Sequence, residues 1–294
     1  CFNKPSPVLM NVTINDNVVS PSSGGGIHAT CVDAVLNDVE ISNNSADHSG
    51  GGIFVDYSNS ILSNVSIIGN YAAGGGGIYV KHATPKLNDV VIKNNSALHY
   101  GGGMHIDYAT PEINHVLIAN NSTLNEFQPI GSLHVVGSTF IMKNSTVVQN
   151  NCIGLSIENG TSNSDMVLIN SILWNPNHEE IHVFSGELDI FYSDVEGGFS
   201  GEGNIDLDPY FMNAQFGNFI LEEDSPCMDA GVAYFEHEGE IIIDLEASEY
   251  TGNAPEMGAF ESCESGMVDE CGVCDGSGYI DMCGTCDSDT SNDC

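Results

Sequence analysis

Arginine is absent from this chain of 294 residues, and only five lysines stand against 41 aspartates and glutamates. Proteins that bind nucleic acids neutralise phosphates with lysine and arginine, and basic residues also attract proteins to anionic membranes. A formal net charge of −36 therefore argues against both kinds of partner. No apolar run approaches the roughly 18 residues that a membrane-spanning helix needs, so we expect no membrane span. The acidity favours solubility and the binding of cations.

Cysteine is plentiful, with ten residues, of which six lie from Cys263 onward. Many cysteines in a chain with so few basic residues are typical of an oxidising setting, and we expect a secreted protein at a cell surface. The chain opens on Cys1 rather than on Met, which predicts a processed or trimmed chain.

Glycine clusters recur along the first half of the chain. They occur at 24–26, 50–52, 74–77 and 101–103, each followed by Ile or Met. A phosphate-binding loop would occur once, between a strand and a helix, and would usually carry a lysine. Clusters that return every 25 or 26 residues instead indicate a structural repeat.

A second frame repeats with the glycines. The pattern Leu-x-x-Val-x-Ile begins at Leu9 and returns at Leu36, Leu62 and Leu87, with a variant at Ile113 and a looser copy at Met142. Three residues after each copy stands an asparagine; these are Asn17, Asn44, Asn70, Asn95, Asn121 and Asn150. Each unit holds short alternating apolar stretches of strand type, and no segment shows the 3.6-residue period of a helix.

Such units cannot bury an apolar face alone, so they must stack on one another. The sequence therefore predicts an all-β fold, a parallel β-helix of about eight coils of roughly 25 residues. Glycine takes up positive φ without steric cost, and asparagine tolerates it well, so we expect both at the corners of the coils. The predicted domains are the β-helix at 1–196, a β-rich cap continuing the solenoid at 197–262, and a tail at 263–294.

The repeats also resemble a family. The chain has Gly-Gly-Ile and Asn-x-Ser/Ala rungs, followed by "YSDVEGG" (192–198), "GNIDLDPYF" (203–211), "SPCMDAG" (225–231) and "EMGAFE" (256–261). In these features it is similar to secreted bacterial right-handed parallel β-helix proteins with exchangeable C-terminal anchors. Their fold is the pectate-lyase-like superfold, which the resemblance implies here. The family usually has a basic residue shortly before the last motif, and this chain has none there. Because the class includes lyases, hydrolases and adhesins, the fold alone does not assign a function.

The tail is a twelve-residue tandem repeat, "DECGVCDGSGYI" and "DMCGTCDSDTSN", that resembles the Cys-Gly-x-Cys-Asp modules of secreted surface proteins. Its two Cys-x-x-Cys pairs could form a zinc ribbon, but eight residues between them is a tight spacing. We favour disulfides and oxygen-ligated calcium. The expected calcium ligands are Asp269, Asp275, Asp281, Asp287 and Asp289. The cysteines expected in disulfides are Cys1, Cys31, Cys263, Cys271, Cys274, Cys283, Cys286 and Cys294.

The stretch "HEEIH" at 178–182 matches the His-Glu-x-x-His signature of zinc proteases. That chemistry needs a helix, which places both histidines on one face. Here the segment precedes a strand-like stretch, and residues four apart in a strand lie about 13 Å apart. We therefore do not expect a protease.

A better candidate is the column beside the glycines. In Gly-Ile-x-Val the two apolar residues should point inward and leave x outside. The x residues are His28, Phe54, Tyr79, His105 and His134; next to them run Asp56, Lys81 and Asp107, and then Tyr57, His82 and Tyr108. A strip of aromatic and charged side chains can bind carbohydrate, although stacked identical coils also produce such ladders without any ligand. The predicted carbohydrate-binding residues are Phe54, Asp56, Tyr57, Tyr79, Lys81, His105, Asp107 and Tyr108.

We expect a structural or adhesive protein at a cell surface or in the extracellular matrix, with itself or surface glycans as partner and calcium as a stabilising ligand. Its most specific form is end-to-end assembly into filaments, because β-helix ends expose unpaired strand edges and no capping helix precedes Leu9. A Cys1–Cys31 bridge is an alternative to links between chains. The alternative function is a polysaccharide-binding or polysaccharide-cleaving enzyme. Without arginine a lyase is disfavoured, and Asp56 and Asp107 would stand about 9.6 Å apart as a hydrolase pair.

Overall fold

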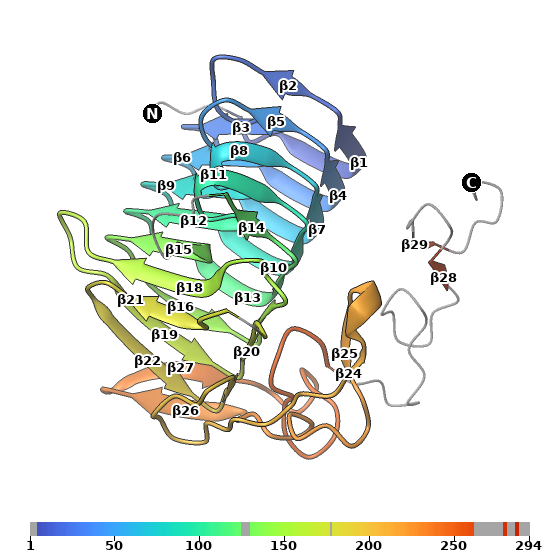
Figure 1. Ribbon diagram of the computed structural model, residues 1–294, viewed down its shortest axis with the longest axis vertical. Coiled ribbons are helices and arrows are strands. Elements are labelled where there is room, and N and C mark those ends of the chain that lie inside the picture. The colour runs from blue at the N-terminus through green and yellow to red at the C-terminus, as the bar shows by residue number, and fades with distance from the viewer. Residues whose placement is uncertain (1–4, 125–129, 177, 262–278, 281–285, 288–294) are drawn as a thin grey trace.

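The computed structural model describes residues 5–124, 130–176 and 178–261, together with two short strands at 279–280 and 286–287. Its strands stack as rungs of a rod, with the N-terminus at one end (Figure 1). Three parallel sheets form the walls, which we name sheets A, B and C. The predicted all-β parallel β-helix is confirmed, and the eight strands on the main path of sheet A enclose about seven full turns.

Sheet A is the largest, with eleven strands. Its strands are β1 (Val8–Asn15), β4 (Val35–Ser42), β7 (Ile61–Ile68), β10 (Lys86–Lys93), β13 (Glu112–Ala119), β16 (Thr139–Lys143), β17 (Thr146–Val148), β19 (Asp165–Ile169), β20 (Ile172–Trp174), β22 (Glu187–Phe191) and β23 (Asp194–Val195). The repeated frame pairs like with like, as Leu87 with Leu62 and Ile92 with Ile67.

Sheets B and C complete each turn. Sheet B holds β2 (Val18–Val19), β5 (Ser45–Ala46), β8 (Tyr71–Gly74), β11 (Ser96–Tyr100) and β14 (Ser122–Thr123). Sheet C holds β3 (Ile27–Thr30), β6 (Ile53–Asp56), β9 (Ile78–Lys81), β12 (Met104–Asp107), β15 (Gly131–Val136), β18 (Ile153–Glu158) and β21 (Ile181–Val183). The core is continuous along the rod, because each coil places the same aliphatic side chains inward.

Glycine is required at the corner before sheet C. The glycine three residues before the Ile or Met of each cluster has positive φ, for example +65° at Gly50 and +61° at Gly75. The glycine that follows it needs space for another reason, since a Cβ on Gly51 would lie 2.4 Å from the carbonyl oxygen of Gly76 in the next coil. The clusters are therefore corners, as predicted.

The asparagine column differs from the prediction. Asn44, Asn70, Asn95, Asn121 and Asn150 are buried, and each side-chain Nδ2 donates to the Oδ1 of the next asparagine over 2.9–3.1 Å. The left-handed conformation is taken by the residue before each of them, such as Asn43 (φ +55°) and Asn94 (φ +58°). The amide needs an inward direction to reach its neighbours, so the turn falls one position earlier.

After the last coil the chain closes the end of the rod. Ile205 forms one parallel bridge with Asp194, and Asn204 Nδ2 donates to the carbonyl of Ile190 over 2.8 Å. The solenoid continues no further than this. Two antiparallel pairs follow: β24 (Phe211–Asn213) with β25 (Asn218–Leu221), which flank the 3₁₀ turn Ala214–Phe216, and β26 (Tyr234–His237) with β27 (Glu240–Asp244).

These hairpins fold back against the outer face of sheet A. Phe219 packs on Leu117 and Val148, while Ile242 and Ile243 pack on Ile169. Lys93 Nζ donates to the carbonyl of Gly217 over 3.0 Å. A third antiparallel pair, β28 (Tyr279–Ile280) with β29 (Cys286–Asp287), belongs to the tail.

Candidate functional site

The predicted outer strip (His28, Phe54, Tyr79, His105 and His134) lies in register on sheet C. Phe54 pairs with His28 and with Tyr79, and His105 pairs with Tyr79 and with His134. The charged column follows the same register, since Lys81 pairs with both Asp56 and Asp107. The arrangement of both columns is confirmed; their role in binding carbohydrate stays a prediction.

The rings of the strip contact one another. Tyr79 stacks on His105 with centroids 4.5 Å apart and planes at 21°, while Phe54 tilts against Tyr79 at 5.6 Å. In the neighbouring column Tyr57 stacks on His82 at 4.8 Å and 17°. Aromatic side chains hold sugars with their faces, and here the faces meet other rings of the ladder. The stacking of Tyr79 on His105 and of Tyr57 on His82 therefore covers ring faces that a sugar would need.

Exposure along the strip also differs from the prediction. His105 is only 5% exposed, Asp107 9% and His134 0%, although all three point away from the core. The ring of Tyr100, from the end of β11, lies parallel to His134 at 5.7 Å and edge-on to His105 at 5.8 Å. Outward side chains in this half of the strip are therefore covered by neighbouring elements.

The charged side chains contact one another, although Asp56 Oδ1 and His82 Nδ1 are buried without a hydrogen bond among the described residues. Lys81 Nζ lies 3.5 Å from Asp107 Oδ2, and the Tyr79 hydroxyl donates to the same oxygen over 2.9 Å. Burial, together with Asp107, raises the pKa of Tyr79. His82 Nδ1 lies 3.5 Å from Asp56 Oδ1. Asp56 and Asp107 each have their own partner, so they do not converge on one reacting atom.

Tyr57, His82 and Tyr108 occupy a corner that sequence reasoning did not foresee. Their φ values are +50°, +45° and +49°, a conformation that bulky residues rarely adopt. Their rings stack as a column, and Tyr108 is fixed because its hydroxyl accepts from the backbone N–H of Thr161 over 2.7 Å. The stacking of these rings along the corner is a structural use for this column.

A Ser, His and Glu cluster lies at the covered end of the strip. Ser156 Oγ is 2.7 Å from His134 Nδ1, and His134 Nε2 is 3.7 Å from Glu158 Oε1. The side-chain types match a nucleophile, a base and an orienting carboxylate. However, Ser156 is fully buried and its Oγ accepts from the backbone N–H of Gly131 over 2.8 Å. No substrate carbonyl can approach that oxygen in this arrangement.

The stretch 178–182 is not helical. Ile181 and His182 belong to β21, and His182 Nδ1 contacts the carboxylate of Glu179 at 3.0 Å. Glu180 is buried and accepts from Asn175 Nδ2 over 2.7 Å, which ends the asparagine ladder. Without a helix the two histidines lack the geometry of a zinc protease.

The predictions for Cys1, for the tail disulfides and for the calcium ligands Asp269, Asp275, Asp281, Asp287 and Asp289 lie outside the described residues, apart from the backbone of Cys286 and Asp287 in β29. Of the described cysteines, Cys152 and Cys227 are free thiols, and neither belongs to the predicted disulfide set. Within the described residues no three or more His, Cys, Asp or Glu gather in a group that could hold a metal ion.

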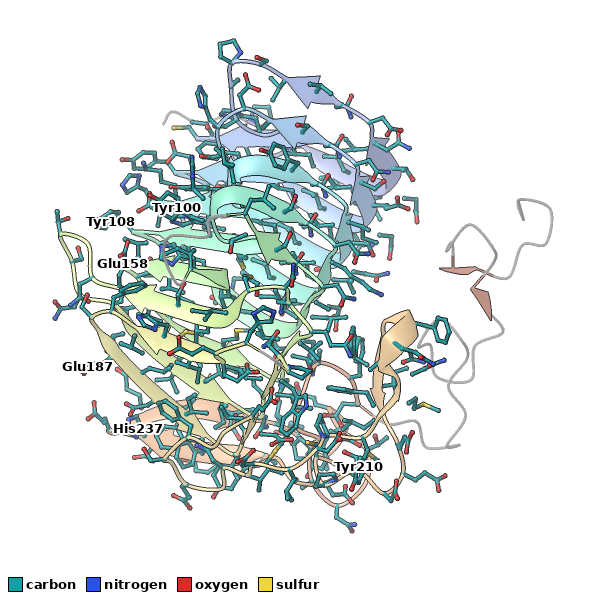
Figure 2. All side chains as sticks on the ribbon, in the orientation of Figure 1. Tyr100, Tyr108, Glu158, Glu187, Tyr210 and His237 are labelled. Carbon is teal, nitrogen blue, oxygen red and sulfur yellow. The ribbon has the colours of Figure 1, made fainter. Side chains whose placement is uncertain are left out.

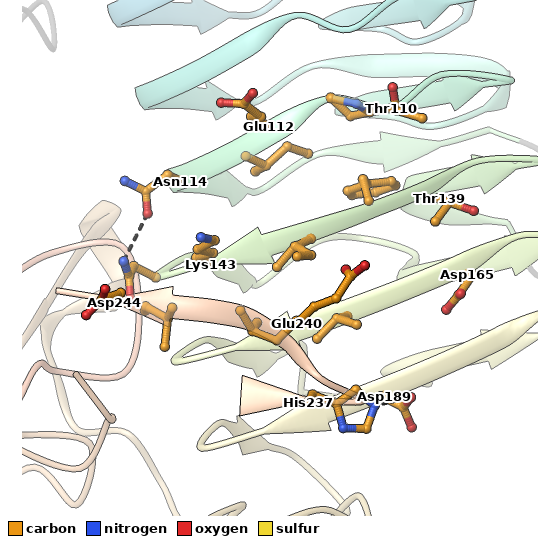
Figure 3. Close-up of a pocket in the computed structure, with 18 of the residues that line it drawn as sticks. Thr110, Glu112, Asn114, Thr139, Lys143, Asp165, Asp189, His237, Glu240 and Asp244 are labelled. Atoms are coloured by element: carbon orange, nitrogen blue, oxygen red, sulfur yellow. Dashed lines mark hydrogen bonds and ion pairs between the residues drawn. The ribbon is translucent and has the colours of Figure 1, made fainter. Parts of the chain in front are cut away.

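A groove of about 890 Å³ lies between sheet A and the β26–β27 hairpin (Figure 3). Its floor is the outer face of β13, β16, β19 and β22, and its wall is the hairpin. Ile141, Val167 and Ile242 provide an apolar centre, while Thr110, Asn114 and Thr139 provide hydroxyl and amide groups. Glu187 and His237 mark this side of the rod in Figure 2.

The groove is strongly acidic. Eight of its 23 lining residues are Asp or Glu, against 41 of 294 in the whole chain, so carboxylates are enriched there. They are Glu112, Asp165, Glu187, Asp189, Glu238, Glu240, Asp244 and Glu249. Glu112 pairs with Lys86 at 2.7 Å and Asp189 with His237 at 3.3 Å. Asp165 and Glu187, which are neighbours in register, have no such partner among the described residues.

Lys143 is the lysine of the groove. Burial lowers the pKa of its amine, while Glu112 acts in the opposite direction. Among the described residues it forms no ion pair within 4 Å, so its N–H groups remain available to a ligand. Carboxyl groups with raised pKa lie elsewhere: Glu180 at about 8, Asp194 at about 6 and Glu261 at about 9, each because of burial.

Sequence reasoning missed the groove. The outward positions of sheet A could be read as polar from their alternation, for Thr139, Asp165 and Glu187 begin successive strands. The wall could not be placed, because nothing in the sequence says that residues 234–244 fold back onto that face.

Residues 9–138 match the family model described as the right handed beta helix region. No curated protein and no solved structure matched the chain. The match and the parallel ladders together establish a right-handed parallel β-helix. In the part of the chain that the structure describes, no helix has the length and apolar character needed to cross a bilayer.

Proposed function

We propose that this β-helix is an adhesive protein of the cell surface or extracellular matrix that binds glycans in the acidic groove beside the β26–β27 hairpin. The observation that carries the proposal is the groove itself, which is open, about 890 Å³ in volume and lined by carboxylates, amides, hydroxyls and one lysine. Sugar hydroxyls need such a mixture of donors and acceptors. The right-handed β-helix fold is consistent with a surface or polysaccharide-related protein.

The charge of the groove selects among glycans. Uronate polymers would meet eight carboxylates, six of which have no ion pair among the described residues. Like charges brought together in a partly desolvated groove repel one another. Neutral sugars and sugars with free amino groups meet no such repulsion, so they are the ligand class that the groove favours.

Polysaccharide hydrolysis remains the second candidate because of one specific pair. Asp165 and Glu187 are neighbours in register on adjacent strands, which lie about 4.8 Å apart. Side chains that leave neighbouring strands at that spacing can bring their carboxyls to the roughly 5–5.5 Å separation of retaining glycosidases. Release of new reducing ends, lost in Glu187→Gln, would support hydrolysis; binding without release would support adhesion.

The test of the proposal measures binding of three matched oligosaccharides by calorimetry. The probes are a glucosamine hexamer, its fully N-acetylated counterpart and a uronate hexamer. We expect the first two to bind and the uronate not to bind. The variant Asp165→Asn/Glu187→Gln should bind at least tenfold more weakly. Glu223→Gln/Asp224→Asn, which neutralises two exposed carboxylates that do not line the groove, should bind like the wild type. Equal losses in both variants, or no binding of any probe, would refute the proposal.

End-to-end assembly is a further form of the adhesive role. In the first described coil, β1, β2 and β3 pair only with the following coil, and Val8, Met10 and Val18 are more than half exposed. Open strand edges of this kind template further pairing. At the other end, residues 197–205 cover the last strands of sheet A, so a filament would require this cover to be displaced. Light scattering across protein and calcium concentrations tests it; a monomer under all conditions would rule it out.

A further inference from the structure

Two buried histidines face outward on sheet C beneath one tyrosine. His105 on β12 and His134 on β15 are neighbours in register, with ring centroids 4.9 Å apart and planes nearly perpendicular. They are 5% and 0% exposed. Tyr100, itself 42% exposed, covers both rings from the end of β11. Figure 2 shows Tyr100 and Glu158 on the same side of the rod.

The two rings have ring nitrogens without hydrogen-bond partners. His134 Nδ1 lies 2.7 Å from Ser156 Oγ, but His134 Nε2 and His105 Nδ1 are buried and have no hydrogen bond among the described residues. A neutral imidazole tolerates this situation at a modest cost. A cationic imidazole does not, because a buried charge needs a partner.

The two histidine rings have different charged neighbours. Glu158, on β18, places Oε1 3.7 Å from His134 Nε2, so a proton on His134 faces a carboxylate. Around His105, β9 contributes Lys81 and Tyr79, and β15 contributes His134 itself. Asp107, on β12, is the nearest acid of that group, but Lys81 and the Tyr79 hydroxyl already occupy it.

We propose that the His105–His134 pair is an acid-sensitive latch, in which protonation of His105 forces Tyr100 off the pair and opens the outer face of β12 and β15. A proton on His134 faces the carboxylate of Glu158. A proton on His105 has no acceptor in the closed arrangement and stands beside the cation Lys81 and the ring of His134. Opening brings water to His105 and separates its charge from theirs.

The pH dependence follows from linkage. Burial first, and then His134 and Lys81, hold the pKa of His105 well below its ordinary value in the closed state. Because closure lowers the pKa of His105, the closed state becomes less favourable as pH falls below the ordinary histidine pKa of about 6.5. If the open state has that ordinary pKa, the opening equilibrium rises about 25-fold between pH 7 and pH 5.

Hydrogen exchange of backbone amides tests the latch. Protection of β11, and of the Gly75 N–H that donates to the carbonyl of Tyr100 over 2.8 Å, should fall by about 25-fold from pH 7 to pH 5 after correction for the intrinsic rate, while β4 and β7 keep their protection. His105→Gln should abolish this difference. His182→Gln, on β21 and far from Tyr100 in sequence, removes an exposed histidine and should leave the difference intact.

Glu158→Gln provides a variant with the opposite effect. It removes the carboxylate that faces a proton on His134 in the closed state, so opening should begin at higher pH than in the wild type, and the closed state at pH 8 should be unaffected. An unchanged pH profile in Glu158→Gln, or the wild-type profile in His105→Gln, would overturn the proposal. If His105→Gln fails to fold, the direction of the Glu158→Gln shift still decides it.

Discussion

The asparagine ladder allows a quantitative test of what holds the coils together. Asn95, in the middle of the rod, makes four side-chain hydrogen bonds that an alanine cannot make. Its Oδ1 accepts from Asn70 N and Nδ2 at 2.8 and 3.0 Å, and its Nδ2 donates to Ile67 O and Asn121 Oδ1 at 2.8 and 3.1 Å. All four are buried. At about 1 kcal/mol net each, Asn95→Ala should lower the free energy of unfolding by about 4 kcal/mol.

Asn17 is the matched control at the open end of the same ladder. It donates to Asn44 Oδ1 at 2.9 Å and to Asn15 O at 2.9 Å, and water can replace both bonds because the site is exposed. Asn17→Ala should therefore cost at most about 1 kcal/mol. Urea unfolding followed by circular dichroism compares the two variants, and their m-values should agree if unfolding stays cooperative. Equal losses in the two variants would refute the reasoning that buried amides stabilise the stack.

Three further outcomes are expected. Gly76→Ala should destabilise the protein by several kcal/mol in thermal melting, because the new Cβ would lie 2.4 Å from the carbonyl oxygens of Gly102 and Ser96. In the control Gly239→Ala the new Cβ has no atom within 4 Å, so stability should fall by only about 1 kcal/mol, because of the φ of +84°. Burial raises the pKa of Glu180 to about 8, above the value in the unfolded chain. The contribution of Glu180 to stability is therefore complete below about pH 4 and is lost as pH rises toward 8. Glu180→Gln should flatten this decline of melting temperature with pH, and an unchanged slope would contradict the reasoning. Calcium should raise the melting temperature more than matched monovalent salt does, by about 2.7 kcal/mol of stability at a hundredfold excess over Kd, and a shift equal to that of the salt control would leave only screening.

Much of the fold could be predicted because the repeat encodes it locally. A frame such as Leu87-x-x-Val90-x-Ile92, recurring every 25–29 residues, forces identical positions to stack, and the structure pairs them residue by residue. The position of the left-handed corner was predicted one residue late. Glycine and asparagine both tolerate positive φ, and only the stacked coils show that the amide of Asn95 is needed inside while Asn94 makes the turn.

The candidate site depended on tertiary contacts. The residues from Phe54 to His134 were predicted to form a column, and they do. That Tyr100 covers His105 and His134 cannot be derived from the sequence of a single coil. The groove depended even more on tertiary contacts. Asp165 in its floor and Glu240 in its wall are 75 residues apart, and they belong to the parallel sheet A and to an antiparallel hairpin. Alternation along a strand predicts which side chains face outward, since it acts between adjacent residues. Which outward face is then covered is decided by the packing of Ile242 and Ile243 against Ile169, a long-range burial of apolar surface that no local pattern specifies.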